Sequence, residues 1–126
     1  MTEAELKDRT KMFALRMLKS VDALPNTKSG RVLANRLARS GTSVGANYRS
    51  ACRARSLADM GSKLSIVEEE ADESAFWLEL IGDVELMPQE KIVRLHAEAG
   101  EITAIMVASR KTLLERDRKS KIENRK

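Results

Sequence analysis

The residues best suited to chemistry in this chain are seven basic residues in the stretch from Lys28 to Arg55, which contains no acidic residue. Wound as an α-helix, most of the seven gather in an arc of about 80° opposite an apolar face. Guanidinium groups held along a rigid helix can bind successive phosphates, and each neutralised phosphate adds salt-dependent affinity. The pattern predicts a surface that binds an RNA or DNA backbone through Lys28, Arg31, Arg36, Arg39, Arg49, Arg53 and Arg55.

A second interpretation of the same charges stays open. Residues 56–86 carry nine acidic residues and a single base, Lys63, so their carboxylates can instead pair with the arginines of the preceding helix. Exposed ion pairs of this kind contribute only about 0–1 kcal/mol each. Tyr48 is the only aromatic residue among the arginines and projects towards the apolar face, so base stacking, and with it sequence readout, is not predicted.

Residues for catalysis are few. His96 is the only histidine, and no serine or cysteine stands at a spacing that predicts a catalytic triad. A di-metal site in a helical bundle needs, twice over, a carboxylate three residues before an inward-facing histidine, but Val93 holds that position here. Gly41 and Gly45 do not form a phosphate-binding loop or a dinucleotide fingerprint. We expect no catalytic residue, no metal site and no cofactor, and predict that the protein is not an enzyme.

Composition favours one helical domain. The 126-residue chain is 42% hydrophobic but only 3% aromatic, and its common residues are helix formers rather than strand formers. No apolar run approaches the ~20 residues that a membrane span needs, and the first residues are too polar for a signal peptide. We therefore expect a cytoplasmic protein with no membrane partner. The single cysteine, Cys52, excludes an internal disulfide.

Boundary signals divide the chain into four helices. Thr2 and Ser56 each stand three residues before an acid, which is capping-box spacing, and Pro25 and Pro88 interrupt the helical pattern. Apolar residues at steps of three and four predict helices over residues 3–24, 27–54, 57–86 and 88–116. Short connections favour an antiparallel up-down-up-down four-helix bundle over residues 1–117. We expect the basic tail, residues 118–126, to be disordered because it has little apolar surface.

Five residues are expected to serve helix packing or oligomer contacts. Gly41 and Gly45 cost about 1 kcal/mol each relative to alanine, so they indicate either a close approach of two helices or a kink or break. Tyr48 belongs to the apolar face. Glu68 lies at the edge of the apolar stripe and needs a partner, for which an arginine or hydroxyl of the second helix is the natural candidate. Trp77 forms a second apolar patch that should meet the fourth helix or another subunit.

The most distinctive stretches of the sequence are residues 39–56, RSGTSVGANYRSACRARS, and residues 63–80, KLSIVEEEADESAFWLEL. In order, spacing and overall chain length they resemble the four-helix-bundle family of 23S rRNA intervening-sequence proteins. One departure is Ala75-Phe76 before Trp77, where the family pattern has Leu-Tyr, so a hydroxyl is lost.

The resemblance implies a homopentameric ring of four-helix bundles. It also implies kinship with the accessory variability determinant of diversity-generating retroelements, a pentamer that binds nucleic acid and a reverse transcriptase. Two hypotheses follow. The first is a non-catalytic oligomer that binds RNA or DNA through the basic helix. The second is a protein-interaction scaffold, for example for a reverse transcriptase or another protein partner, whose charges serve assembly and docking.

Overall fold

The computed structural model of the chain describes residues 1–125, which contain four helices and no strand. The helices are α1 (Glu3–Asp22), α2 (Lys28–Cys52), α3 (Leu57–Asp83) and α4 (Gln89–Asn124). The expected all-α class is therefore confirmed, and the arrangement is consistent with a four-helix bundle. Within the described range no helix combines the length and the apolar character needed to cross a membrane.

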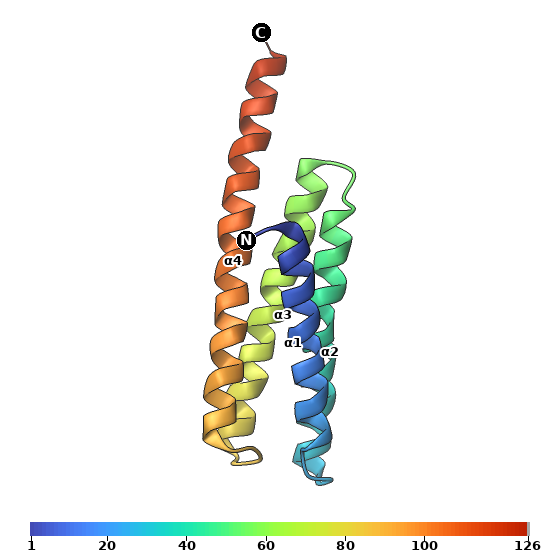
Figure 1. Cartoon of the computed structure of the whole chain (residues 1–126), viewed down its shortest axis with the longest axis vertical. Coiled ribbons are helices and arrows are strands. Elements are labelled where there is room, and N and C mark those ends of the chain that lie inside the picture. The colour runs from blue at the N-terminus through green and yellow to red at the C-terminus, as the bar shows by residue number, and fades with distance from the viewer. Residues whose placement is uncertain (126) are drawn as a thin grey trace.

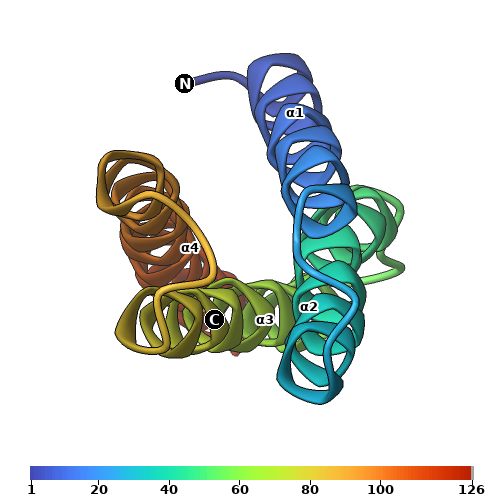
Figure 2. The same ribbon diagram turned by 90° about the horizontal axis from the view of Figure 1, so that it is seen from below.

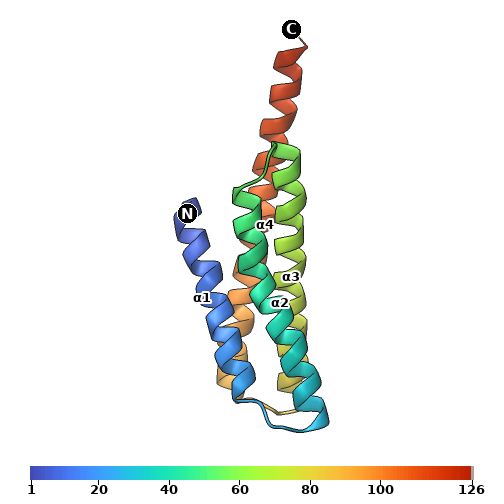
Figure 3. The ribbon, with the colours of Figure 1, turned by 90° about the vertical axis from the view of Figure 1, so that its right-hand side faces the viewer.

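Helices that are consecutive in the sequence pack against each other, while α1 and α4 touch only slightly. The α1–α2 and α3–α4 connections lie at one end of the molecule and the α2–α3 connection lies at the other (Figures 1 and 3). Viewed along the helices, α2 and α3 stand side by side, and α1 and α4 lie on the same side of this pair but apart from each other (Figure 2). α2 is therefore flanked by α1 and by α3.

The core is built from the apolar stripes of all four helices. Its largest fully buried side chains include Phe13, Met17, Leu37, Ile81 and Met106. Tyr48 also lies in the core, with 4% of its surface exposed, and Cys52 packs partly buried against it. Burial raises the pKa of the Cys52 thiol, which disfavours its reactive thiolate form.

α2 is one uninterrupted helix, so it does not break at its two central glycines. Both glycines face α1 at close range. A Cβ atom added to Gly41 would lie 2.5 Å from Cγ of Met17, and one added to Gly45 would lie 3.3 Å from the carbonyl oxygen of Thr10. The absence of side chains at these two positions lets the axes of α1 and α2 approach closely.

One charged cluster joins α1 to α4 where the two helices otherwise have little contact. The guanidinium group of Arg9 donates two hydrogen bonds to Glu98, of 2.9 and 2.6 Å, and a third of 2.7 Å to Glu101. The hydrogen bond from Arg9 is the main reason that the pKa of Glu98 lies below its ordinary value. Such a bidentate, partly buried pair fixes geometry as well as adding free energy.

α4 is longer than expected. It continues to Asn124, so the predicted helix end at residue 116 is too early, and residues 118–125 are described as part of this helix or its cap. Its last turns project beyond the other helices (Figures 1 and 3). Lysine, arginine and glutamate are good helix formers, and Lys121 pairs with Asp117 one turn earlier, so local interactions favour continuation of the helix. The last residue of the predicted tail, residue 126, lies outside the described residues.

The glycine contact predicts opposite effects for the same substitution at two helical glycines. Gly41→Ala should lower the free energy of unfolding by about 1–3 kcal/mol, because the new methyl group overlaps Met17. Gly100→Ala should raise it by about 0.5–1 kcal/mol, because nothing lies within 4 Å of the added Cβ and alanine favours the helix. Urea denaturation measures both values, and a Gly41→Ala protein as stable as the wild type would contradict the close approach.

The Arg9 cluster predicts a pH-dependent loss of stability. Because the folded-state pKa of Glu98 is depressed, its contribution is present above the ordinary glutamate pKa of 4.5 and is lost as pH falls through the lower folded-state value. Arg9→Gln should therefore lower the free energy of unfolding at pH 7 by about 1 kcal/mol, and by much less near pH 3. Urea denaturation at the two pH values tests this, with Arg118→Gln as the exposed control. An equal loss at both pH values would argue against the pair.

Candidate nucleic-acid interface

All seven basic residues predicted to bind nucleic acid have exposed side chains. They fall into three groups along α2 and its C-terminal end. Lys28 and Arg31 stand in its first turn, Arg36 and Arg39 at its middle, and Arg49, Arg53 and Arg55 at and just beyond its last turn. The groups differ in what else they contact, and this difference decides which of them are free for a ligand.

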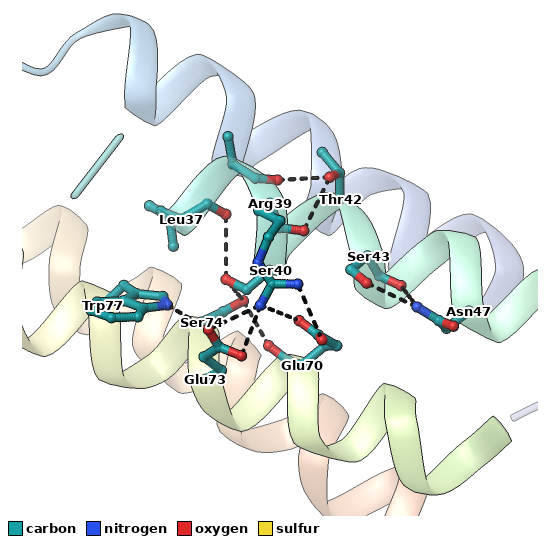
Figure 4. Close-up of polar contacts among 11 residues, drawn as sticks. Leu37, Arg39, Ser40, Thr42, Ser43, Asn47, Glu70, Glu73, Ser74 and Trp77 are labelled. Carbon is teal, nitrogen blue, oxygen red and sulfur yellow. Dashed lines mark hydrogen bonds and ion pairs between the residues drawn. The ribbon is translucent and has the colours of Figure 1, made fainter. Parts of the chain in front are cut away.

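Arg39 forms ion pairs that join α2 to α3. Its guanidinium group lies between two carboxylates of α3, 3.3 Å from Glu70 and 3.0 Å from Glu73 (Figure 4). The hydrogen bond to Glu73, followed by the charges of Glu70 and Glu73, raises the pKa of Arg39. The alternative interpretation, in which arginines of the second helix pair with acids of the third, therefore holds for this residue.

The second middle residue, Arg36, lies against an aromatic ring. Its guanidinium carbon is 5.7 Å from the ring centroid of Trp77, a cation–π distance, and the indole nitrogen of Trp77 donates a 3.1 Å hydrogen bond to Glu73. Trp77 also makes an edge contact with Phe76, whose side chain is 51% exposed. Trp77, which was expected to meet α4 or another subunit, thus contacts Arg36 of α2.

A buried hydroxyl pair lies beside this contact. The Oγ atoms of Ser40 and Ser74 are 2.9 Å apart and share a hydrogen bond between α2 and α3 (Figure 4). Neighbouring hydroxyls bond within α2, where Thr42 donates to the carbonyl oxygen of Ala38 at 2.7 Å. The polar residues at the middle of α2 are therefore satisfied locally and do not require a ligand.

The basic residues at the two ends of α2 differ from Arg39 in their contacts. Within residues 1–125, the side chains of Lys28, Arg49, Arg53 and Arg55 form no ion pair, and Arg31 bonds only to the carbonyl and side-chain oxygens of Asn26, at 3.3 and 3.1 Å. One of the seven predicted cations is thus neutralised by carboxylates. Both ends of the helix keep positive charge that faces solvent.

The structure adds two cations that sequence analysis missed. Lys7 and Lys11 of α1 line a groove of about 280 Å³ together with Arg49 and the small residues Thr42 and Gly45. Lys7 also pairs with Glu3 at 3.4 Å, whereas Lys11 is exposed. The sequence signal was the four-residue spacing of these lysines on one helix face, but only the packing of α1 on α2 brings them to Arg49.

Glu68 has a different partner from the expected one. Its carboxylate accepts hydrogen bonds of 2.9 and 3.2 Å from the guanidinium group of Arg110, which comes from α4 rather than α2. Both side chains are largely shielded from solvent, with 21% and 32% exposed. The Nε atom of Arg110 is buried and has no hydrogen-bond partner among the described residues. The pair therefore belongs to the α3–α4 contact.

His96, the only histidine of the sequence, contacts an acid of α3. Its side chain is half-buried within α4, and its Nε2 atom is 3.0 Å from a carboxylate oxygen of Glu79. Within the described residues, no group of three or more His, Cys, Asp or Glu side chains is placed to hold a metal ion. The exposed cations at the two ends of the rigid helix α2 are suited to binding an anion.

A comparison with protein families and a comparison with solved structures each found a match to this chain. The model of the family of 23S rRNA-intervening sequence proteins matches residues 2–108. A crystal structure at 1.70 Å resolution, of a protein with unknown function from the S23 ribosomal protein family of Bacteroides thetaiotaomicron VPI-5482, is 35% identical with a TM-score of 0.79. The likeness covers 84% of this chain and 98% of that chain. No curated protein matches.

The Glu68 contact predicts unequal effects for two neighbouring substitutions. Glu68→Gln should lower the free energy of unfolding by about 1–3 kcal/mol, since it leaves the half-buried guanidinium of Arg110 without its carboxylate. Glu69→Gln removes the same charge at an exposed position and should change stability by less than about 0.5 kcal/mol. Chemical denaturation compares them, and similar values for both variants would show that the pair contributes nothing.

Proposed function

This chain belongs to the family of 23S rRNA-intervening sequence proteins, and we propose that it is a non-catalytic protein that binds RNA or DNA through the basic face of α2. The observation that carries the proposal is that a single one of the seven predicted cations, Arg39, is neutralised by carboxylates within residues 1–125. A basic helix that served only to hold α3 would have its charges paired with the nine acids of residues 56–86. The free cations at its two ends are available to phosphates.

The shape of the surface favours backbone contacts over base readout. α2 has 25 residues, so its ends lie about 36 Å apart at ~1.5 Å per residue, a length that spans several phosphates of a nucleic acid. Arg49 extends the surface onto α1 through Lys7 and Lys11. Tyr48 is buried and Trp77 lies under Arg36, so neither ring is available to stack on a base. Binding should depend on salt and little on sequence.

Assembly is part of the proposal. An antiparallel up-down-up-down bundle that forms a homopentamer would present several copies of the basic face and raise a weak affinity through avidity. Support comes from apolar surface on the α2–α3 side, where Val32 and Val84 are 58% and 52% exposed and line a shallow hollow with Leu33 and Leu80. Lys28 also lines this hollow, so a neighbour seated there would leave the cations at the C-terminal end of α2 for phosphates. Apolar patches of this kind are commonly covered by a neighbouring molecule.

A second candidate function is a protein-interaction scaffold, for example for a reverse transcriptase or another protein partner. The observation that favours it is Phe76, which is 51% exposed beside the half-buried Trp77 and the exposed acid Asp72. Exposed aromatic side chains are typical of protein contact surfaces. In this case the charges of α2 would serve assembly or docking rather than phosphate binding.

Fluorescence anisotropy with a labelled single-stranded RNA, measured against salt concentration, tests the proposal. Arg49→Gln combined with Arg53→Gln should weaken binding about tenfold at ~50 mM salt and reduce the slope of log affinity against log salt by about 1.4, which corresponds to two phosphate contacts on a single strand. Arg39→Gln is the matched control and should leave affinity nearly unchanged, because that cation is already paired.

Gel filtration of the same variants separates the two candidate functions. Nucleic-acid binding predicts that the double variant keeps the wild-type oligomeric state while it loses affinity. Failure of the wild type to bind RNA or single-stranded DNA at ~50 mM salt would refute the proposal. A double variant that dissociates before it loses affinity would favour the scaffold.

A further inference from the structure

A second concentration of positive charge lies away from α2, between the C-terminal half of α1 and the first turns of α4. A hollow of about 250 Å³ is lined by four basic side chains, one buried hydroxyl and one buried leucine, namely Arg16, Lys19, Lys91, Arg94, Ser20 and Leu95. No acidic residue lines it. The volume is far larger than a single water molecule needs.

The four basic side chains that line the hollow have no acidic partner in the part of the chain that the structure describes. Within residues 1–125, none of their side chains takes part in an ion pair, although Arg16 and Lys91 are only partly exposed. The pKa of Glu98 is lowered first by the hydrogen bond from Arg9, and the charge of Arg16 contributes only weakly to that shift. Both oxygens of Glu98 are already bonded to Arg9.

The two ends of the contact between α1 and α4 differ in their charges. There, α1 and α4 are joined by one arginine and two glutamates, Arg9, Glu98 and Glu101. At this end, α1 and α4 both contribute cations to one hollow, so their charges repel. Both α1 and α4 carry acidic residues at other positions. The grouping of four cations around one hollow is therefore not needed for either helix to form. A multivalent anion in the hollow would turn the repulsion into attraction.

We propose that the hollow between α1 and α4 is a binding site for a compact oligophosphate, either a free oligophosphate or the phosphate tail of a nucleoside triphosphate. Two cations from each helix would surround the anion, and the buried Ser20 and Leu95 would form its floor. Ser20 donates its hydroxyl proton to the carbonyl oxygen of Arg16 at 2.7 Å, so the charged side chains provide the donors. The site shares no residue with the proposed nucleic-acid surface, which consists of basic residues of α2 and its C-terminal end together with Lys7 and Lys11 of α1.

Isothermal titration calorimetry with tripolyphosphate, ATP and AMP tests the site on the full chain at ~100 mM salt. We expect tripolyphosphate to bind and AMP to bind at least about tenfold more weakly, because a single phosphate meets fewer of the four cations. ATP that binds more tightly than tripolyphosphate would identify the nucleotide as the source of the oligophosphate, and equal or weaker binding would identify the free anion.

Two variant pairs and one control make the test specific. Arg16→Gln with Arg94→Gln, and separately Lys19→Gln with Lys91→Gln, should each weaken tripolyphosphate binding about tenfold or more. Arg116→Gln with Arg118→Gln removes the same net charge from the exposed end of α4 and should leave binding within about twofold. The proposal is overturned if wild-type protein does not bind tripolyphosphate at ~1 mM, or if the control loses as much affinity as the site variants.

The nucleic-acid variants distinguish this failure from failure of the proposed function. The pair Arg49→Gln and Arg53→Gln should retain tripolyphosphate binding, while the Arg16 and Arg94 pair should retain RNA binding within about twofold. Loss of both ligands in both pairs would mean that tripolyphosphate binds by general surface charge, which contradicts a built site between α1 and α4.

Discussion

The structure depends on the position of α2 between two helices, which it contacts by different means. On the α1 side the contact requires the absence of side chains, since Met17 occupies the space of a Cβ at Gly41. On the α3 side it requires polar groups, with the Ser40 and Ser74 hydroxyls buried against each other and Arg39 held between two carboxylates. One helix must therefore carry small, polar and charged residues in register over a short central segment.

This constraint determines which charged side chains form ion pairs and which remain exposed to solvent. The acids of α3 serve both of its neighbours, because Glu70 and Glu73 bind Arg39 of α2 while Glu68 binds Arg110 of α4. Pairing is concentrated at the middle of α2, and the cations at its two ends remain exposed. A long helix with a paired centre and charged ends is a suitable platform for an extended anion, because bound phosphates do not compete with the contact that holds the bundle together.

Local signals predicted the helices well, and the contacts between helices poorly. Apolar steps of three and four indicated the buried stripes, and Thr2 and Ser56 cap α1 and α3 as their spacing indicated. The partner of Glu68 is 42 residues away on α4, so no local pattern could identify it. Trp77 and Arg36 meet only because of the relative rotation of α2 and α3. The exposed end of α4 was misjudged because disorder was inferred from low apolar content, although its residues favour helix.

Nuclear magnetic resonance of the arginine Nε–H groups during titration with a single-stranded RNA tests the central claim most directly, since it reports each guanidinium group separately. The signals of Arg49 and Arg53 should shift with added RNA, while that of Arg39, held by Glu70 and Glu73, should stay in place. RNA that shifts Arg39 as much as the other two, or that leaves all three signals unchanged, would contradict the claim that phosphates bind to the unpaired ends of α2.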